Sequence, residues 1–214
     1  MGLGDGMMDY SLAVVTAPTA EPVTTAEAKL HCRVDHPDED TYIGSLITAA
    51  RVYSEQYTGR AFVNTTFDMK IDSFPGGGYC PWDEYAPWPD TIYIPRPLLQ
   101  SVTSITYTDT DGTSQTFSSS LYSVDTSSLP GRITLAYGES YPATRQIHHA
   151  VTIRFVGGYG SAASNVPQTI KQAVLLLVGH WYENRETSVT GTMHGPVLHA
   201  VDNLLWSERV KEIL

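Results

Sequence analysis

The sequence of 214 residues is short of cysteine and of long apolar runs, and each shortage excludes a class of protein. Its two cysteines, Cys32 and Cys80, can pair, but two cysteines do not make the disulfide framework of a small secreted protein. No apolar stretch approaches the ~20 residues that a membrane-spanning helix needs. Residues 1–10 lack the basic start of a signal peptide. We therefore expect a soluble protein that assembles inside the cell and makes no membrane contact.

Charge is also scarce, and basic charge most of all. Charged residues make up 17% of the chain, against roughly a quarter in ordinary globular proteins. The 13 lysines and arginines are outnumbered by 23 aspartates and glutamates, which gives a net charge of −10. Tight DNA binding requires clustered cations that neutralise phosphates, and no such cluster is present. An acidic protein can still surround DNA, but it does so without gripping it.

Sequence patterns of enzyme active sites are missing as well. There is no Gly-x-Ser-x-Gly elbow, and residues 157–160 are not a phosphate-binding loop because no Lys-Ser/Thr pair follows them. Asp109-Thr110-Asp111-Gly112 resembles the opening of a calcium loop, but position twelve of that motif is Ser120 instead of glutamate. We expect a hairpin turn there, and we expect no catalytic residue, metal or cofactor in the chain.

Two groups contain residue types that bind metals. The better zinc candidate is the group His31, Cys32, Asp35 and His36. A zinc site needs three or four ligands that converge, whereas these residues share one short helix and its exit, so polar surface is favoured. His180 and Glu183 lie one helical turn apart, in the reverse order to the Glu-x-x-His of bundle metal sites and in a single copy. A hydrogen-bonded core histidine is the favoured interpretation of that second group.

Helical periodicity marks both ends of the chain. Thr24 followed by Glu27 fits a capping box, which predicts a short helix ending near residue 33. A longer helix is predicted over 40–57, with Arg51 and Glu55 facing water. Two more helices are predicted from the same spacing of apolar residues. They cover 167–184 and about 197–210.

The middle of the chain has the two-residue period of strands instead. Asp111-Gly112 between two such runs is a strong hairpin signal. In 150–156, Val151, Ile153 and Phe155 should face one way and their neighbours the other. Strands are predicted over 62–71, 91–94, 103–107, 113–117, 121–125, 132–136 and 150–156.

Together these patterns predict an α+β fold with a small helical core and a large β-rich insertion. Two main antiparallel helices, 40–57 and 167–184, should pack against each other, with the C-terminal helix added to them. The expected division is an N-terminal arm over 1–21 that does not pack, a connector domain over 22–186, and a linker with a C-terminal docking helix over 187–214. Within the connector domain, 22–59 and 166–186 are helical and 60–158 is the insertion.

Two stretches have the composition of contact surfaces. A loop over 75–90, dense in glycine and proline, carries Tyr79, Trp82, Tyr85 and Trp88. Aromatic residues are enriched at interfaces, although these tryptophans can also fold back on their own domain. The last helix offers an apolar stripe and a tryptophan, namely Val197, Val201, Leu204, Leu205 and Trp206. We predict that both stretches are interfaces.

An ordered series of short motifs also resembles a known family. The series runs from Thr24–Leu30 and Arg33-Val34-Asp35 through Pro95–Leu98, Pro130–Ile133, Phe155–Gly160 and Val166-Pro167 to His180–Arg185. Over about 23–210 this order is similar to the head–tail connector proteins of long-tailed bacteriophages, also called adaptor or head-completion proteins. The loop 75–90 and the arm before Pro22 depart from the family, so their contacts cannot be taken from it.

The resemblance implies a structural role in the virion neck after assembly in the host cytoplasm. Twelve copies would form a ring beneath the portal protein, and a stopper or tail-terminator protein would follow on the tail side. DNA would pass through the ring without sequence-specific binding, and no catalytic residue is implied. We further expect 185–196 to act as a swinging connector that lets 197–214 dock on the portal.

Two other functions stay open from the sequence alone. One is a different neck or tail-side structural protein, such as a stopper or a tail terminator. The other is a metal-dependent hydrolase, which stoichiometric zinc in the purified protein would indicate.

Overall fold

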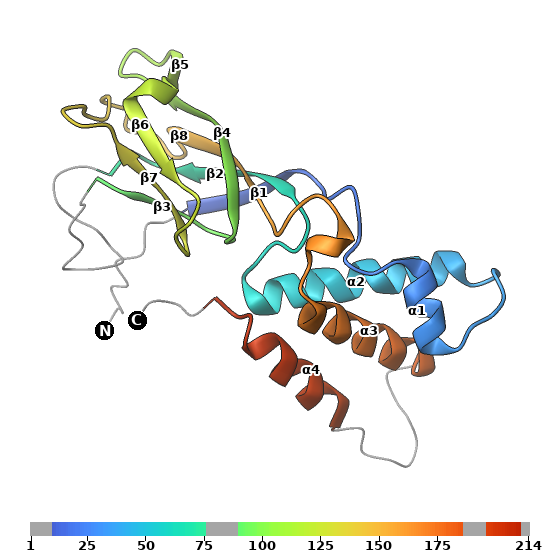
Figure 1. Ribbon diagram of the computed structural model, residues 1–214. Coiled ribbons are helices and arrows are strands. Elements are labelled where there is room, and N and C mark those ends of the chain that lie inside the picture. The colour runs from blue at the N-terminus through green and yellow to red at the C-terminus, as the bar shows by residue number, and fades with distance from the viewer. Residues whose placement is uncertain (1–9, 76–89, 186–195, 211–214) are drawn as a thin grey trace, which may run out of the picture. The chain divides into compact units, whose positions relative to one another are not determined.

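A computed structural model describes residues 10–75, 90–185 and 196–210. These residues form four α-helices and two antiparallel sheets, a mixed α/β architecture (Figure 1). They divide into two compact units. The β unit comprises residues 10–17 and 65–158, and the helical unit comprises residues 18–64 and 159–210.

Apart from residues 10–16, the elements follow the predicted periods, with boundaries shifted by a few residues. The helices are α1 (Thr25–Cys32), α2 (Asp40–Thr58), α3 (Gln168–Glu183) and α4 (Pro196–Trp206). A five-stranded sheet has the order β1 (Tyr10–Thr16), β2 (Thr65–Ile71), β8 (Val151–Gly157), β4 (Leu99–Thr108) and β5 (Ser114–Phe117). A three-stranded sheet has the order β3 (Ile92–Ile94), β7 (Gly131–Leu135) and β6 (Tyr122–Asp125). Within the described ranges, no helix is both long and apolar enough to cross a bilayer.

The ends of the first two helices follow from single residues. The Thr24 hydroxyl accepts a hydrogen bond from the Glu27 N–H at 3.2 Å, and the Glu27 carboxylate accepts one from the Thr24 N–H at 2.7 Å. This is the predicted capping box. Helix α2 ends at Gly59, which has φ +72° and donates its N–H to the Glu55 carbonyl. Glycine adopts this left-handed conformation without a steric penalty.

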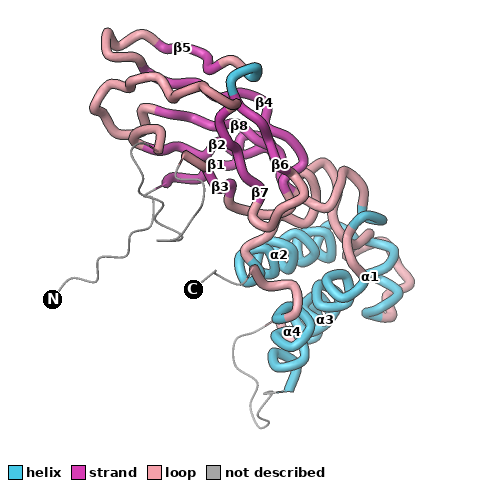
Figure 2. Tube along the Cα trace, turned by 60° about the vertical axis from the view of Figure 1, so that its left-hand side comes forward, coloured by secondary structure: helices cyan, strands magenta, loops and turns pink. Residues whose placement is uncertain are grey.

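The helical unit is built around one apolar core. Helix α2 packs against α3, and α4 packs against α3 and more lightly against α2 (Figure 2). The predicted strand at 62–71 starts only at Thr65, because Phe62 and Val63 are fully buried in this helical core instead. Among the most deeply buried members are Ala28, Ile43, Ile47, Ala50, Phe62, Ile170, Ala173, Val174, Leu177, Val201 and Leu205.

Arg51 of α2 is buried in the helical unit, so the prediction that Arg51 and Glu55 face water is wrong. Arg51 is 9% exposed and donates to Glu21 Oε2 at 2.7 Å and to Glu55 Oε2 at 2.9 Å. Burial alone would lower the pKa of Arg51, but the two carboxylates outweigh burial and raise that pKa. Helical periodicity assigns faces by polarity alone, and it cannot foresee that the segment carrying Glu21 comes to lie beside Arg51.

The large sheet confirms the predicted alternation of apolar and polar residues. On β8, Val151, Ile153 and Phe155 are all fully buried. Phe155 lies opposite Phe67 of β2, and their rings stack with centroids 5.4 Å apart. On the other face of the same two strands, Arg154 donates two hydrogen bonds to the Asp68 carboxylate, at 2.7 and 2.8 Å.

The small sheet contributes a second set of buried isoleucines to the β unit. Ile92, Ile94 and Ile133 are at most 1% exposed. The β unit also contains an aromatic cluster. The ring of Phe74 stacks on that of Tyr141, with centroids 4.7 Å apart, and its centroid lies 5.6 Å from that of the Phe117 ring. The β unit therefore has an apolar interior of its own.

Residues 10–16 form strand β1, although the arm over 1–21 was expected not to pack. Strand β1 pairs antiparallel with β2, from Tyr10 opposite Ile71 to Val14 opposite Phe67. It lies at the edge of the sheet and only Tyr10 and Leu12 are half-buried, so the strand lacks a clear alternation that sequence analysis can detect. Its partner strand is also some fifty residues away in the sequence.

Candidate interaction surfaces

In the described part of the helical unit, three large apolar side chains are exposed to solvent. Leu30 of α1 is 82% exposed, Trp206 of α4 is 60% exposed and Val52 of α2 is 39% exposed. Isolated apolar residues on a surface are ordinary, but a leucine or tryptophan exposed to this degree is a natural anchor for a partner. The sequence does not mark Leu30 as exposed, because α1 has almost no amphipathic pattern that would set one apolar residue apart.

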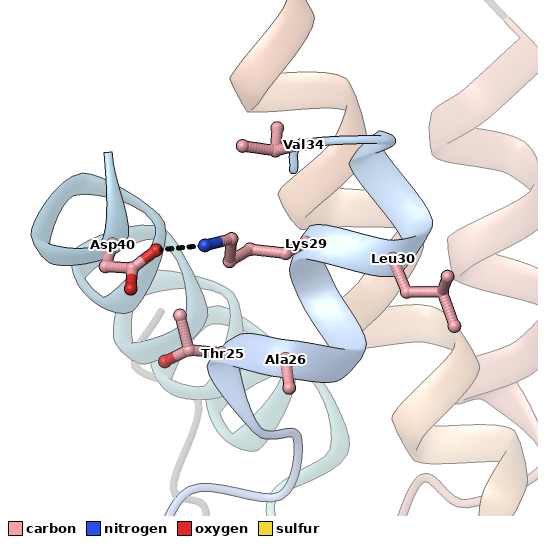
Figure 3. Close-up of a pocket in the computed structure, with 6 residues that line it drawn as sticks. All are labelled: Thr25, Ala26, Lys29, Leu30, Val34 and Asp40. Carbon is pink, nitrogen blue, oxygen red and sulfur yellow. Dashed lines mark hydrogen bonds and ion pairs between the residues drawn. The ribbon is translucent and has the colours of Figure 1, made fainter. Parts of the chain in front are cut away.

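A shallow pocket of about 410 Å³ opens beside Leu30 (Figure 3). Its lining residues are Thr25, Ala26, Lys29, Leu30, Val34 and Asp40. Figure 3 shows Lys29 reaching from α1 to Asp40 at the start of α2, with Nζ and Oδ1 2.7 Å apart, while Leu30 points away from this ion pair. The Asp40 side chain is 47% exposed. The pocket therefore combines apolar side chains with a charged edge.

The predicted apolar stripe of α4 is divided between the interior and the surface. Val201 and Leu205 are fully buried in the core of their own helical unit, and Leu204 is partly buried against it. Trp206 is exposed, and the Arg209 guanidinium lies 5.6 Å from the centroid of its ring. The side chain of Val197 lies outside the described residues. While α4 is packed, Trp206 is open to a partner and Val201 and Leu205 are not, so the interface over this stripe stays a prediction.

The chain after α4 is fastened beside the end of α2. Val210 donates its N–H to the Thr58 carbonyl at 2.8 Å. The Arg60 guanidinium donates to the Glu208 carbonyl at 2.5 Å, and the Tyr159 hydroxyl donates to the Glu208 carboxylate at 3.1 Å. Burial raises the pKa of Tyr159 to about 12. The end of α4 therefore has a defined place in the helical unit.

The end of α3 is fastened as well. The Arg185 guanidinium lies 4.7 Å from the Tyr42 ring centroid and 5.1 Å from that of Tyr182, and it donates to Glu39 Oε1 at 2.5 Å. The Tyr182 hydroxyl also donates to Glu39. These hydrogen bonds lower the pKa of the Glu39 carboxyl. Arg185, the first residue of the predicted connector, is thus held at the start of α2, and 186–195 lies outside the described residues.

The zinc candidate group does not assemble into a site. Within the described ranges, no three His, Cys, Asp or Glu side chains gather as metal ligands. His31 packs against α3 where Gly179 makes room: a Cβ there would lie 3.0 Å from the His31 ring. Cys32 is half-buried, and burial followed by the nearby Glu183 carboxylate raises the pKa of its thiol. Asp35 and His36 lie exposed after α1.

The other two candidates for metal binding are used within the fold. The Asp109 carboxylate accepts the N–H groups of Asp111 and Thr113, at 3.1 and 2.8 Å, so it closes the predicted hairpin turn between β4 and β5. His180 has its Nδ1 atom 3.3 Å from the side-chain nitrogen of Asn184. Each of these polar groups has a structural partner one turn or less away.

The predicted aromatic surface lies outside the described residues, and so does Cys80. Its members are Tyr79, Trp82, Tyr85 and Trp88. The β unit exposes other large apolar side chains, which sequence analysis did not single out. They are Val14, Val15, Leu129, Tyr137 and Ile147.

The described residues form two packed units that expose large apolar side chains such as Leu30 and Trp206. A family model described as Head completion protein matches residues 22–214. The chain therefore belongs to the head completion protein family. This match confirms the resemblance seen in the sequence, and with it a structural virion protein of the head–tail junction.

The fold is shared with solved particle structures. One is a chain in the neck of an empty gene transfer agent particle computed with C6 symmetry, with TM-score 0.74, 23% identity, and coverage of 95% of this chain and 97% of that one. Chains from the virion of a native gene transfer agent particle and from its neck computed with C12 symmetry match with TM-scores of 0.72 and 0.70, each at 22% identity and the same coverage. None of the curated proteins compared with the chain matches it.

Proposed function

We propose that this protein is a ring adaptor between the portal and the tail-side proteins of a tailed particle. Twelve copies surround the DNA channel and extend it, with no catalytic step. The observation that carries this proposal is the family match over 22–214, together with a fold match that covers nearly the whole of chains in gene transfer agent necks computed with C6 and with C12 symmetry. In this proposal the helical unit is the core of the adaptor, and the β unit is the insertion into it.

The acidic composition supports a channel wall. A net charge of −10 repels phosphates, so DNA can slide past without being held. A stopper or a tail terminator would also need a channel wall that repels DNA. The position of the protein in the particle therefore distinguishes an adaptor from a stopper and from a tail terminator. Electron microscopy of the assembled particle should show a twelve-fold ring in contact with the portal. A ring one layer or more below the portal would contradict the adaptor role.

The second part of the proposal is that 197–214 docks on the portal by swinging about the connector 185–196. Because Val201 and Leu205 are fully buried against the helical core, docking requires α4 to leave α3. Each buried aliphatic side chain is worth about 1.5–3 kcal/mol, so portal contacts would have to replace roughly 3–6 kcal/mol. The portal must therefore offer an apolar groove of comparable depth.

A reversible disulfide tests whether portal binding requires α4 to separate from α3. A Cβ built on Gly59 would lie 3.6 Å from the Val210 Cβ, which is within the range for a disulfide. The strain of a side chain at φ +72° is present in both redox states, so the comparison between them does not depend on it. The double variant Gly59→Cys/Val210→Cys, made with Cys32→Ser and Cys80→Ser, should bind portal when reduced and lose portal binding when oxidised. Equal portal binding in the two redox states would rule out the swinging helix and leave the ring itself untouched.

A further inference from the structure

Glu208, which follows α4 by two residues, is held by three side chains of the helical unit. The Tyr159 and Thr169 hydroxyls each donate a hydrogen bond of 3.1 Å to its carboxylate. The Arg60 guanidinium donates one of 2.5 Å to its carbonyl. We call Arg60, Tyr159, Thr169 and Glu208 the Glu208 cluster.

The partners of Glu208 come from segments that flank α2 and α3. Arg60 follows α2, and Thr169 lies in the first turn of α3. Tyr159 precedes α3 and packs against the helical core. Figure 1 shows the end of α4 beside the end of α2 and the start of α3. The Glu208 cluster therefore joins the end of α4 to both of these helices.

The Glu208 carboxylate also supplies what the start of α3 lacks. Pro167, at the N-cap of α3, has no side-chain oxygen that can cap a helix, and the first turn, Gln168–Lys171, contains no acidic residue. The start of a helix has unpaired N–H groups and a partial positive charge, so a carboxylate stabilises it. Through its hydrogen bond with Thr169, Glu208 brings a carboxylate to this turn. Release of Glu208 therefore has a cost for α3 as well as for α4.

Helix α4 itself is held in a different way. Its described side chains that pack against the helical core are the apolar Val201, Leu204 and Leu205. Apolar contacts are non-directional, so an apolar groove on a portal can replace them. The hydrogen bonds of Glu208 depend on donors at fixed positions, and a carboxylate is a stronger acceptor than a neutral group. These hydrogen bonds must therefore break when α4 moves to a new partner.

We propose that the Glu208 cluster keeps α4 on its own subunit and so sets the affinity of the unbound protein for the portal. The inference rests on the movement of 197–214 proposed above and names the residues that oppose it. A protein that binds a partner only in a minor conformation has its apparent affinity reduced by the fraction of molecules in that conformation. Weakening the Glu208 cluster raises this fraction and should therefore tighten portal binding.

The test uses full-length variants that leave 197–214 unchanged, so no portal contact is altered. Tyr159→Phe and Thr169→Val each remove one hydrogen bond to Glu208. Each should bind the portal protein of the same particle about threefold more tightly than the wild type, and the double variant about tenfold, in a titration at fixed salt. Hydrogen exchange of the unbound double variant should show lower protection in α4.

Thr48→Val is the matched control. The Thr48 hydroxyl, on α2, donates a hydrogen bond of 2.9 Å to the Glu21 carboxylate, so the same substitution removes the same kind of bond without touching Glu208. It should leave both portal binding and the protection of α4 unchanged.

The two measurements distinguish failure of this inference from failure of the proposed movement. Unchanged protection of α4 in the double variant would overturn the role of the Glu208 cluster, while the movement of α4 would still be judged by the disulfide experiment. Lower protection of α4 with unchanged or weaker portal binding would show that release of α4 does not limit docking. That result would overturn the proposed movement and this inference together.

Discussion

The two units reach their stability by different routes. The β unit draws nearly all its strands from one continuous stretch, 65–158, and its long ladders join β2, β8 and β4. The helical unit is assembled from two distant stretches, 18–64 and 159–210, whose helices meet in one core. The helical unit therefore depends on its last helix, which supplies the fully buried Val201 and Leu205, whereas the β unit does not depend on that helix.

The Arg51 ion pairs of the helical unit are also more deeply buried than the Arg154–Asp68 pair of the β unit. In the helical unit, Arg51 lies buried between two carboxylates that come from different segments of the chain. In the β unit, Arg154 meets Asp68 across neighbouring strands, and the Arg154 side chain is 43% exposed. A buried charge that loses its partners is expensive, and a partly exposed pair is worth little. The helical unit should therefore be the more sensitive of the two to single changes.

Removal of 197–214 should have the largest effect. It takes Val201 and Leu205 out of the core, so we expect the helical unit to lose about 3–6 kcal/mol of stability. Hydrogen exchange should show lower protection in α2 and α3 and unchanged protection in β2 and β8. Asn203→Ala, at an exposed position of α4, is the control and should leave exchange unaltered. An equal loss in the strands would mean that the two units unfold as one.

The substitution Arg51→Met should have the second-largest effect on stability. It leaves Glu21 and Glu55 without their shared cation, at a cost of about 3 kcal/mol in the free energy of unfolding. Lys29→Met removes the cation of the partly exposed Lys29–Asp40 pair and should cost less than about 1 kcal/mol. Urea denaturation of both variants gives the comparison. Similar costs would show that burial of Arg51 does not matter to its contribution.

The Asp68–Arg154 pair should give a small effect that depends on pH. The hydrogen bonds from Arg154 lower the pKa of Asp68, so the native state favours the charged carboxylate. This contribution is fully present above the ordinary pKa of an aspartate and is lost as pH falls through the lowered value. Asp68→Asn should therefore destabilise the protein by about 1 kcal/mol or less at pH 7 and by progressively less in acid. A constant difference between pH 7 and pH 2 would contradict the assignment.

Duplex DNA should bind the protein weakly or not at all, which is the smallest effect we expect. The net charge is −10 and no cluster of basic residues occurs in the sequence, so a gel-shift titration should show weak or no binding even at low salt. Micromolar binding would contradict the picture of a repelling channel wall. The β unit and the helical unit should not differ in this respect.

Local signals predicted most of the elements, and long-range contacts account for the errors. The capping box at Thr24, the Asp-Gly turn after β4 and the alternation of β8 all depend on residues within a few positions of one another. Strand β1 was missed because its partner β2 lies some fifty residues away. The exposure of Leu30 was missed because it depends on which elements cover α1, and no short pattern records that.

By itself, the sequence determined the helical and strand periods, the acidic charge and the resemblance to head-completion proteins, because each is a property of neighbouring residues or of their order. The burial of Arg51, Val201 and Leu205 and the exposure of Trp206 emerge from the folded structure. Burial depends on what packs against a side chain, which local sequence does not record. In this protein the covering segments come from the two distant stretches that make up the helical unit.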